Sequence, residues 1–203
     1  MSINRRRRHL LLGTAALLVA PTGVWASQRE EQLADNVAST MRRSVNNVSP
    51  ARLVFSTRQA GQAWLAEMSA RLSKFIADAR ERETILINVQ YEAKRAGLDV
   101  QLVLGLIEVE SMFRRYAISG VGARGLMQVM PFWARHIGTQ QHNLFDIRTN
   151  LRYGCTILRY YIDREKGDVM RALARYNGSL GRMTYPNKVY AALNRHWTYH
   201  GVL

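Results

Sequence analysis

The chain has 203 residues and a formal net charge of +14 at pH 7. That length suits one medium-sized domain with an extension, and the single cysteine, Cys155, excludes an intramolecular disulfide. The positive charge favours anionic polymers such as nucleic acid, acidic lipid or cell-wall glycan with peptide carboxylates. Because the sequence contains neither a C2H2 zinc-finger spacing nor an RNP-type aromatic motif, we do not expect nucleic acid as a partner.

Residues 1–26 have the pattern of a secretory signal peptide. Arg5 to Arg8 form the basic region, residues 10–20 the apolar region, and Val24-Trp25-Ala26 a small-x-small cleavage site. We expect a periplasmic protein without a stable membrane anchor after cleavage, because the apolar run is too short for a comfortable span. An uncleaved anchor is the alternative, and Arg7-Arg8 leaves the choice between Sec and twin-arginine export open.

The residues that follow show helical periodicity. Over 27–48, apolar side chains recur every four residues, which predicts a helix with a narrow apolar stripe formed by Leu33, Val37, Met41 and Val45. A second helix is expected over 57–79 and a third over 83–96, where Gly97 ends it. No strand-like alternation and no internal repeat occur, so the predicted class is all-α.

The stretch 99–133 is the one around which the rest of the chain is organised. Asp99 suits an N-cap, and the apolar run that continues to Met112 predicts a helix. One stripe of this helix is polar or small, formed by Gln101, Gly105 and Glu108. Glu108 is therefore expected to face water or a neighbouring helix.

Glu110 lies near the C-terminal end of the same predicted helix, but on its apolar face. It shares that face with Val103, Leu106 and Ile107. Burial disfavours the charged carboxylate, and the negative end of the helix dipole acts in the same direction, so both raise its pKa. A carboxyl group that stays protonated near neutral pH can serve as a general acid. The alternative is a structural ion pair with an arginine, for which Arg114, Arg115 and Arg124 are candidates.

A glycine-rich loop follows, and it carries a recognisable string. Three glycines within six residues, Gly120, Gly122 and Gly125, predict a tight loop with unusual backbone angles. Glu110-Ser111, followed by Gly122-Ala123-x-Gly125-Leu126-Met127-Gln128-x-Met130-Pro131, resembles the first two motifs of the soluble lytic transglycosylases. The resemblance implies an all-α, goose-lysozyme-like catalytic domain over 81–203, with 27–80 as a helical N-terminal extension.

Two later motifs continue the resemblance in the same order. Ala174-Arg175-Tyr176-Asn177-Gly178 resembles the family's Ala-Tyr-Asn-Ala-Gly, with Arg175 inserted. Tyr185-x-x-x-Val189 matches the fourth motif, although the linker from Asn177 is shorter than is usual in the family. Tyr190 is the reserve candidate for that tyrosine.

The resemblance implies a mechanism with one carboxylate. Glu110 would cleave the β-1,4 bond between N-acetylmuramic acid and N-acetylglucosamine in peptidoglycan, as acid and then as base, and give 1,6-anhydromuramoyl products. Ser111 and Tyr185 would support Glu110 by hydrogen bonds. Substrate contacts are expected from Gln128, Met130, Tyr176 and Asn177. No cofactor is implied. A metal site is not expected either, because His196 and His200 at i, i+4 lack a third ligand.

Three other functions are compatible with parts of the pattern. A muramidase that uses water would need a second carboxylate, and Asp146 is the candidate, although an Asp before a helix is commonly a cap. A non-catalytic peptidoglycan-binding or scaffolding protein would be expected to lack Glu110. A basic nucleic-acid binder would not need an export signal. Exo- or endo-cleavage, stem-peptide preference, the biological process and the oligomeric state stay open, as does a contact of Arg114, Arg115 or Arg124 with substrate carboxylates.

Overall fold

The computed structural model describes residues 28, 30, 32–33, 35–46, 49–139 and 141–201. The predicted signal peptide, residues 1–26, lies outside the described residues. Within the described part of the chain, no helix is both long and apolar enough to cross a membrane.

The described residues form helices and connecting loops, with two isolated β-bridges and no strand. In chain order the helices are α1 Asp35–Val45, α2 Arg58–Leu72, α3 Ala79–Arg95, α4 Val100–Ser111, α5 Pro131–Ile137, α6 Ile147–Arg164, α7 Val169–Tyr176 and α8 Thr184–Ala192, followed by the π-helical turn η1 Leu193–Trp197. The predicted all-α class is confirmed.

Side-chain caps explain where several helices begin. The carboxylates of Asp99, Asp146 and Asp168 accept hydrogen bonds from backbone N–H groups in the first turns of α4, α6 and α7, at 2.8 to 2.9 Å. Asp78 caps α3 in the same way through the N–H of Glu81. The prediction of a helix over 57–79 and another from 83 was therefore wrong at their junction, because α2 ends at Leu72 and α3 already begins at Ala79.

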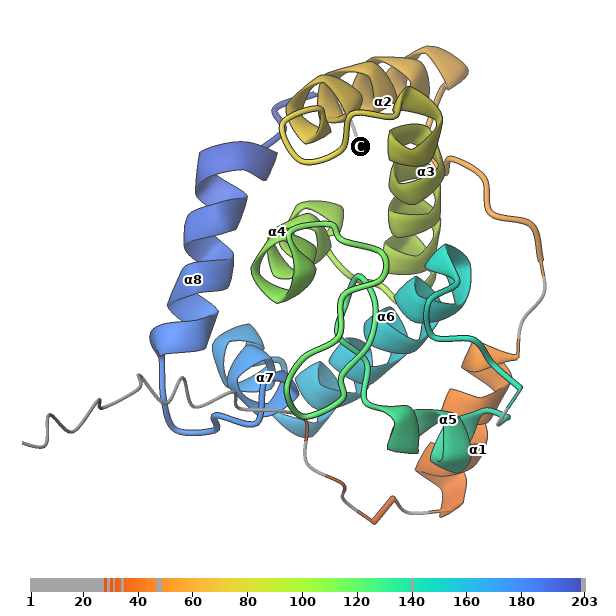
Figure 1. Cartoon of the computed structure of the whole chain (residues 1–203), viewed down its shortest axis with the longest axis vertical. Helices are drawn as coiled ribbons and strands as arrows, with labels where there is room; N and C mark the ends of the chain where they lie inside the picture. The colour runs from red at the N-terminus through yellow and green to blue at the C-terminus, as the bar shows by residue number, and fades with distance from the viewer. Residues whose placement is uncertain are drawn as a thin grey trace, which may run out of the picture.

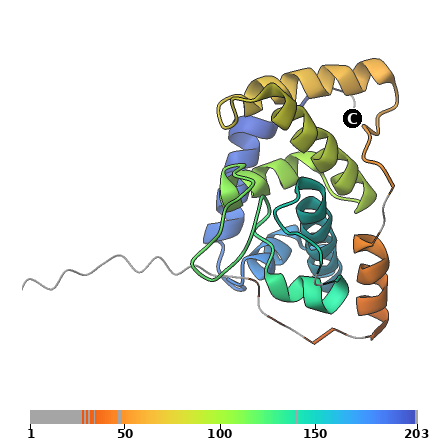
Figure 2. The same cartoon turned by 45° about the vertical axis from the view of Figure 1, so that its right-hand side comes forward.

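Helix α4 lies at the centre of the molecule, with α8 on one side and α2 and α3 on the others (Figures 1 and 2). Residues Val100 to Ile107 are all buried, which is the pattern expected of a helix that has neighbours all round. The small stripe on α4 is where α8 approaches, since a Cβ at Gly105 would lie 2.9 Å from the carbonyl oxygen of Val189. Gly105 therefore sets the distance between α4 and α8.

The N-terminal helices join the same hydrophobic core. Met41 and Val45 of α1 and Trp64, Met68 and Leu72 of α2 are buried in one cluster with α4 and α6. At the end of that cluster, Phe75 packs on Phe113 and Trp197, with ring centroids 5.4 and 6.0 Å away. The segment assigned to the N-terminal extension therefore contributes directly to the packing beneath α4.

A buried carboxylate, Glu92, joins α1, α3 and α6. Its oxygens lie 2.7 Å from Nε of Arg95 and 3.2 Å from Nε of Arg152, and Arg148 is 3.8 Å away. Arg152 also donates to the carbonyl of Val45 at the end of α1. Cys155 is buried nearby, as expected of a small core residue, and burial raises the pKa of its thiol.

Candidate active site

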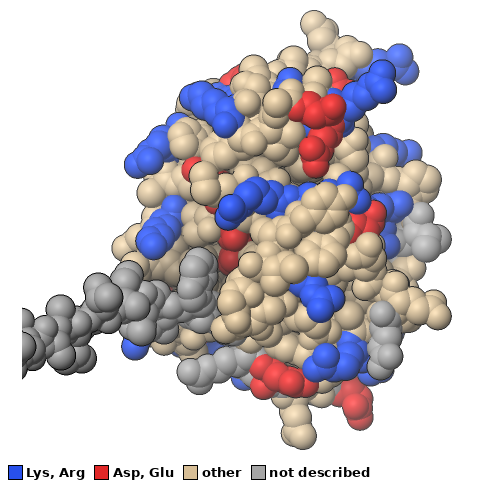
Figure 3. Space-filling model, in the orientation of Figure 1, with Lys and Arg blue, Asp and Glu red and all other residues tan. Residues whose placement is uncertain are grey.

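Glu110 lies at the last turn of α4 and opens into a cleft of about 360 Å³. The cleft is walled by the glycine-rich loop on one side and by the α7–α8 connection and α8 on the other. Figure 3 shows this hollow, with acidic surface at its floor, between α8 and the central loop. The lining residues are Gln28, Val109, Glu110, Ser119, Val121, Ala123, Gln128, Tyr176, Asn177, Ser179, Arg182, Thr184, Tyr185 and Lys188.

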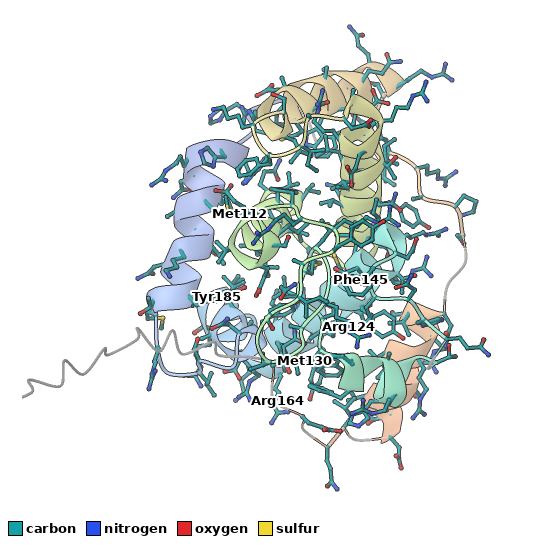
Figure 4. All side chains as sticks on the ribbon, viewed as in Figure 1. Met112, Arg124, Met130, Phe145, Arg164 and Tyr185 are labelled. Carbon is teal, nitrogen blue, oxygen red and sulfur yellow. The ribbon has the colours of Figure 1, made fainter. Side chains whose placement is uncertain are left out.

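Burial raises the pKa of Glu110 from 4.5 to about 7, and the hydrogen bond from Tyr185 opposes that rise. No cation among the described residues lies within ion-pair distance of Glu110. The arginines that the sequence offered as partners are engaged elsewhere. Arg114 donates to the carbonyl of Ser111, Arg115 donates to that of Phe145, and the Arg124 guanidinium lies 5.8 Å from the Phe145 ring (Figure 4). Glu110 is therefore a carboxyl group that can hold its proton near neutral pH.

Tyr185 comes from α8, on the side of that helix that faces α4 (Figure 4). Its hydroxyl donates to Oε1 of Glu110 at 2.5 Å. Burial and the neighbouring Glu110 raise the pKa of Tyr185 well above 10, so the phenol stays protonated as the donor. The reserve candidate, Tyr190, does not line the cleft. The close approach of α8 at Gly105 brings the Tyr185 phenol within reach of Glu110.

The glycine-rich loop owes its shape to Gly125 and to one side chain of α6. Asn150 accepts a hydrogen bond from the N–H of Met127 and donates to the carbonyls of Arg124 and Leu144, each at 2.8 Å. Gly125 has a φ of +75°, and a Cβ there would lie 2.4 Å from the Asn150 amide nitrogen. This clamp fixes the wall of the cleft opposite α8.

The other predicted site residues fall into two groups. Gln128, Tyr176 and Asn177 line the cleft. The Gln128 amide nitrogen donates to the carbonyls of Ala117 and Gly125, which leaves its oxygen for a ligand, and the Tyr176 hydroxyl donates to the carbonyl of Met127 at 2.7 Å. Ser111 and Met130 do not line it. The hydroxyl of Ser111 donates to the carbonyl of Ile107 rather than to Glu110, and Met130 lies at the start of α5.

Two further carboxylates singled out from the sequence, Glu108 and Asp146, both have structural partners. Asp146 is the N-cap of α6. Glu108 faces the neighbouring helical turn η1, which is one of the two environments expected from the sequence. It lies 3.0 Å from Nδ1 of His196 and accepts a hydrogen bond from Nε1 of Trp197 at 2.7 Å. Among the described residues that line the cleft, Glu110 is the acidic one.

Several residues of the cleft were not found from the sequence, among them two cations and an amide. Arg182 and Lys188 belong to the α7–α8 connection and to α8, and no motif singles them out. Gln28 reaches the cleft from the far N-terminal end of the described chain, where it is 4% exposed and accepts from the N–H of Met130 at 3.4 Å. Nothing in the polar stretch around residue 28 signals this placement.

The described residues contain no group of three or more His, Cys, Asp or Glu side chains that could hold a metal ion. His196, one half of the i, i+4 histidine pair, is committed to Glu108.

Comparison with known proteins gives relatives of one kind. A transglycosylase from Enterobacteria phage PRD1 is 38% identical over 104 residues, which cover 48% of this chain and 38% of the relative. The membrane-bound lytic murein transglycosylase C of Mannheimia succiniciproducens is 31% identical over 111 residues, covering 50% of this chain and 31% of the relative. This chain thus spans between about a third and two fifths of these relatives.

A solved structure of lytic transglycosylase Slt from Pseudomonas aeruginosa matches 78% of this chain and 32% of its own, at 23% identity and a TM-score of 0.42. The model of the transglycosylase SLT domain matches residues 87–197, which is more than half of the chain and includes Glu110, the glycine-rich loop and Tyr185. The chain therefore belongs to the transglycosylase SLT domain family.

Proposed function

We propose that this protein is a lytic transglycosylase that cleaves the β-1,4 bond between N-acetylmuramic acid and N-acetylglucosamine in peptidoglycan. The observation that carries the proposal is Glu110, a carboxyl group with a pKa near 7 at the floor of the cleft. Family membership supports a substrate of the murein type, because relatives carry the name lytic murein transglycosylase.

The reaction needs one group that first gives and then takes a proton. Glu110 protonates the glycosidic oxygen as the bond from that oxygen to C1 of the muramoyl residue breaks, and the N-acetylglucosamine end leaves as an alcohol. The Glu110 carboxylate then accepts the proton of the muramoyl 6-hydroxyl, whose oxygen bonds to C1. The product is a 1,6-anhydro sugar, Glu110 is again protonated, and no water is consumed. A nucleophile within the same sugar has a high effective concentration.

The surrounding groups suit these steps. Tyr185 donates to Oε1 of Glu110, so it stabilises the carboxylate that forms after the first proton transfer. Gln128 presents its side-chain oxygen, and Asn177 lies across the cleft from the loop. These residues can orient the sugar hydroxyl and acetamido groups above Glu110. Ser111 would then act through the helix end, where its hydroxyl holds the carbonyl of Ile107.

The hydrolytic alternative is less favoured by the geometry. A muramidase of the two-carboxylate type requires a second acid that can activate water on the opposite face of the sugar. Asp146 is occupied as a helix cap, and the described lining contains no acid besides Glu110. A non-catalytic scaffold would have no use for a carboxyl group whose pKa is raised to about 7.

Digestion of purified sacculi by the protein, followed by mass spectrometry of the products, tests the proposal. We expect anhydromuropeptides from the parent and at least about a hundredfold less from Glu110→Gln, since a general acid contributes about 10²- to 10⁴-fold. Glu83→Gln is the matched control, because this exposed glutamate lies on α3 outside the cleft. Products with reducing muramic acid ends would contradict the proposal and support hydrolysis. Binding to sacculi without any product would support a scaffold.

We also propose that the protein acts in the periplasm after removal of residues 1–26. The support is the basic, apolar and small-residue pattern of that segment. N-terminal sequencing of the protein recovered from the periplasm should begin at Ser27. A mature chain that still begins at Met1 would contradict cleavage.

A further inference from the structure

We propose that Arg182 and Lys188 form a carboxylate-binding wall of the cleft, which recognises an acidic group on the muramoyl arm of the glycan. The acidic group is either the lactyl carboxylate of a strand without peptide or a carboxylate of an attached stem peptide. The inference rests on the proposed function, because it identifies the glycan's charged arm as the ligand.

The two cations share one side of the cleft. Arg182 lies in the connection between α7 and α8, and Lys188 lies on α8 three residues after Tyr185, which places it beside that tyrosine on the helix surface. Both side chains are exposed and line the cleft that holds Glu110. Lys and Arg side chains gather along this edge over α8 in Figure 3.

Neither cation has a side-chain partner among the described residues. The cations of the adjacent helix α7 do have a partner, because Arg171 and Arg175 both pair with Glu165, at 2.8 and 2.6 Å. Glu110 is not the missing counterion, since burial and Tyr185 account for its pKa and no cation lowers it. The cleft therefore presents two positive charges without a counterion, in the same cleft as a carboxyl group that is neutral below about pH 7.

The sugar rings of the glycan carry no charge, so they offer nothing for these cations. Carboxylates occur only on the arm attached to the muramoyl residue, which is also the residue whose bond to the leaving oxygen breaks when Glu110 protonates that oxygen. A carboxylate that enters the cleft loses part of its hydration, and its attraction to Arg182 and Lys188 strengthens as water is displaced. The three arginines suggested by the sequence do not line this cleft, because Arg114 and Arg115 donate to backbone carbonyls and Arg124 lies over the Phe145 ring.

The test compares charge on the protein with charge on the substrate. The variant is Arg182→Gln with Lys188→Gln. The control is Arg58→Gln with Lys74→Gln, which removes the same charge from exposed residues at α2, outside the cleft. Each protein is given soluble glycan strands with stem peptides, the same strands with their carboxylates converted to amides, and strands stripped of peptide by an amidase. The rate of anhydromuramoyl product formation is measured at low substrate concentration.

We expect amidation of the substrate to lower kcat/KM of the parent and of the control by about tenfold, because two exposed charge contacts are each worth a few-fold. The cleft variant should be about tenfold slower on acidic strands and insensitive to amidation. An effect that persists on peptide-free strands assigns the lactyl carboxylate, and one confined to peptide-bearing strands assigns the stem peptide. Equal sensitivity of the variant and the parent to amidation would overturn the inference.

Binding separates this inference from the proposed reaction. In a Glu110→Gln background, the affinity for acidic strands should fall about tenfold when Arg182 and Lys188 are both replaced, and should fall less at high salt. Loss of anhydromuramoyl product in every protein, with this binding difference intact, would remove the reaction and retain the carboxylate site. Unchanged binding would overturn the site.

Discussion

Glu110 and Glu92 are both glutamates in helices packed around the same core, but their surroundings differ. Glu92 is 0% exposed and has the guanidinium groups of Arg95 and Arg152 within 3.2 Å. Among the described residues, Glu110 has no cation within ion-pair distance; it has one phenol as a donor and one open side, toward the cleft. Glu92 ties three helices together, whereas Glu110 carries a pKa raised to about 7.

The difference shows what makes a carboxyl group useful as an acid. Burial with opposite charges stabilises the carboxylate and makes it structural, while burial without them stabilises the neutral acid. The cations of the cleft, Arg182 and Lys188, lie on its wall, where they can contact substrate without lowering the pKa of Glu110. Each prediction below changes one term of this comparison.

The largest effect on stability is expected at Glu92. Glu92→Gln leaves Arg152 and Arg95 without their counterion, and removal of one partner from a buried ion pair costs about 3 kcal/mol of the free energy of unfolding. Urea denaturation measures it. The fraction that remains folded should keep its activity per molecule, since Glu92 does not line the cleft. A loss of activity without a loss of stability would contradict the structural role.

Glu110 should lower the free energy of unfolding at neutral pH, whereas Glu92 raises it, and the effect of Glu110 should depend on pH. Between the unfolded pKa near 4.5 and the folded pKa near 7, the unfolded state releases a proton that the native state keeps, so stability falls as pH rises. The decrease should reach at most about 3 kcal/mol by pH 8, because one pKa unit corresponds to about 1.4 kcal/mol and the side chain partly opens to the cleft. Urea denaturation of the parent and Glu110→Gln from pH 4 to 8 should show the excess pH dependence in the parent alone.

Tyr185→Phe removes the donor to Glu110. The hydrogen bond lowers the pKa of Glu110, so its loss should raise that pKa above about 7 and move the alkaline limb of the kcat/KM profile to higher pH. The maximal rate should fall by about ten- to a hundredfold, because a hydrogen bond to a charged group is worth about 1.5–3 kcal/mol. Tyr190→Phe, outside the cleft, is the control. An alkaline limb that moves to lower pH would contradict this role.

The smallest effect is expected at the contact between α4 and α8. Gly105→Ala places a methyl group 2.9 Å from the carbonyl oxygen of Val189, so α8 must move and Tyr185 with it. Activity should fall a few-fold, and the net loss of stability should be about 1 kcal/mol, since crowding is partly offset by the helix preference of alanine. Gly120→Ala has no heavy atom within 4 Å of the new methyl group and should change neither quantity.

Local signals predicted the parts of the fold that local interactions determine. The caps at Asp99 and Asp146 were predicted, because each needs only the carboxylate and the N–H groups of the next turn. The cap at Asp78 was missed because that residue was placed inside the helix expected over 57–79. No helix was predicted over α8, and Pro186 in its first turn is compatible with one.

The candidate site also contains residues that local motifs predicted and residues that only the tertiary structure brings in. The motif string singled out Glu110, Gln128, Asn177 and Tyr185, which meet in one cleft. Their catalytic and binding roles stay predictions. Arg182, Lys188 and Gln28 reach that cleft only through tertiary structure, so no periodicity or spacing could indicate them. The clamp by Asn150 is a further case, because it joins two segments that are separate in the sequence.

The most direct measurement is the titration of Glu110 itself. Carbon-13 carboxyl NMR of the parent, compared with Glu110→Gln to assign the resonance, gives the pKa without reference to any substrate. The account predicts a midpoint of about 7, and a higher one in Tyr185→Phe. A midpoint near the ordinary glutamate value of 4.5 would mean that Glu110 is ionised at neutral pH, and would contradict its role as the acid.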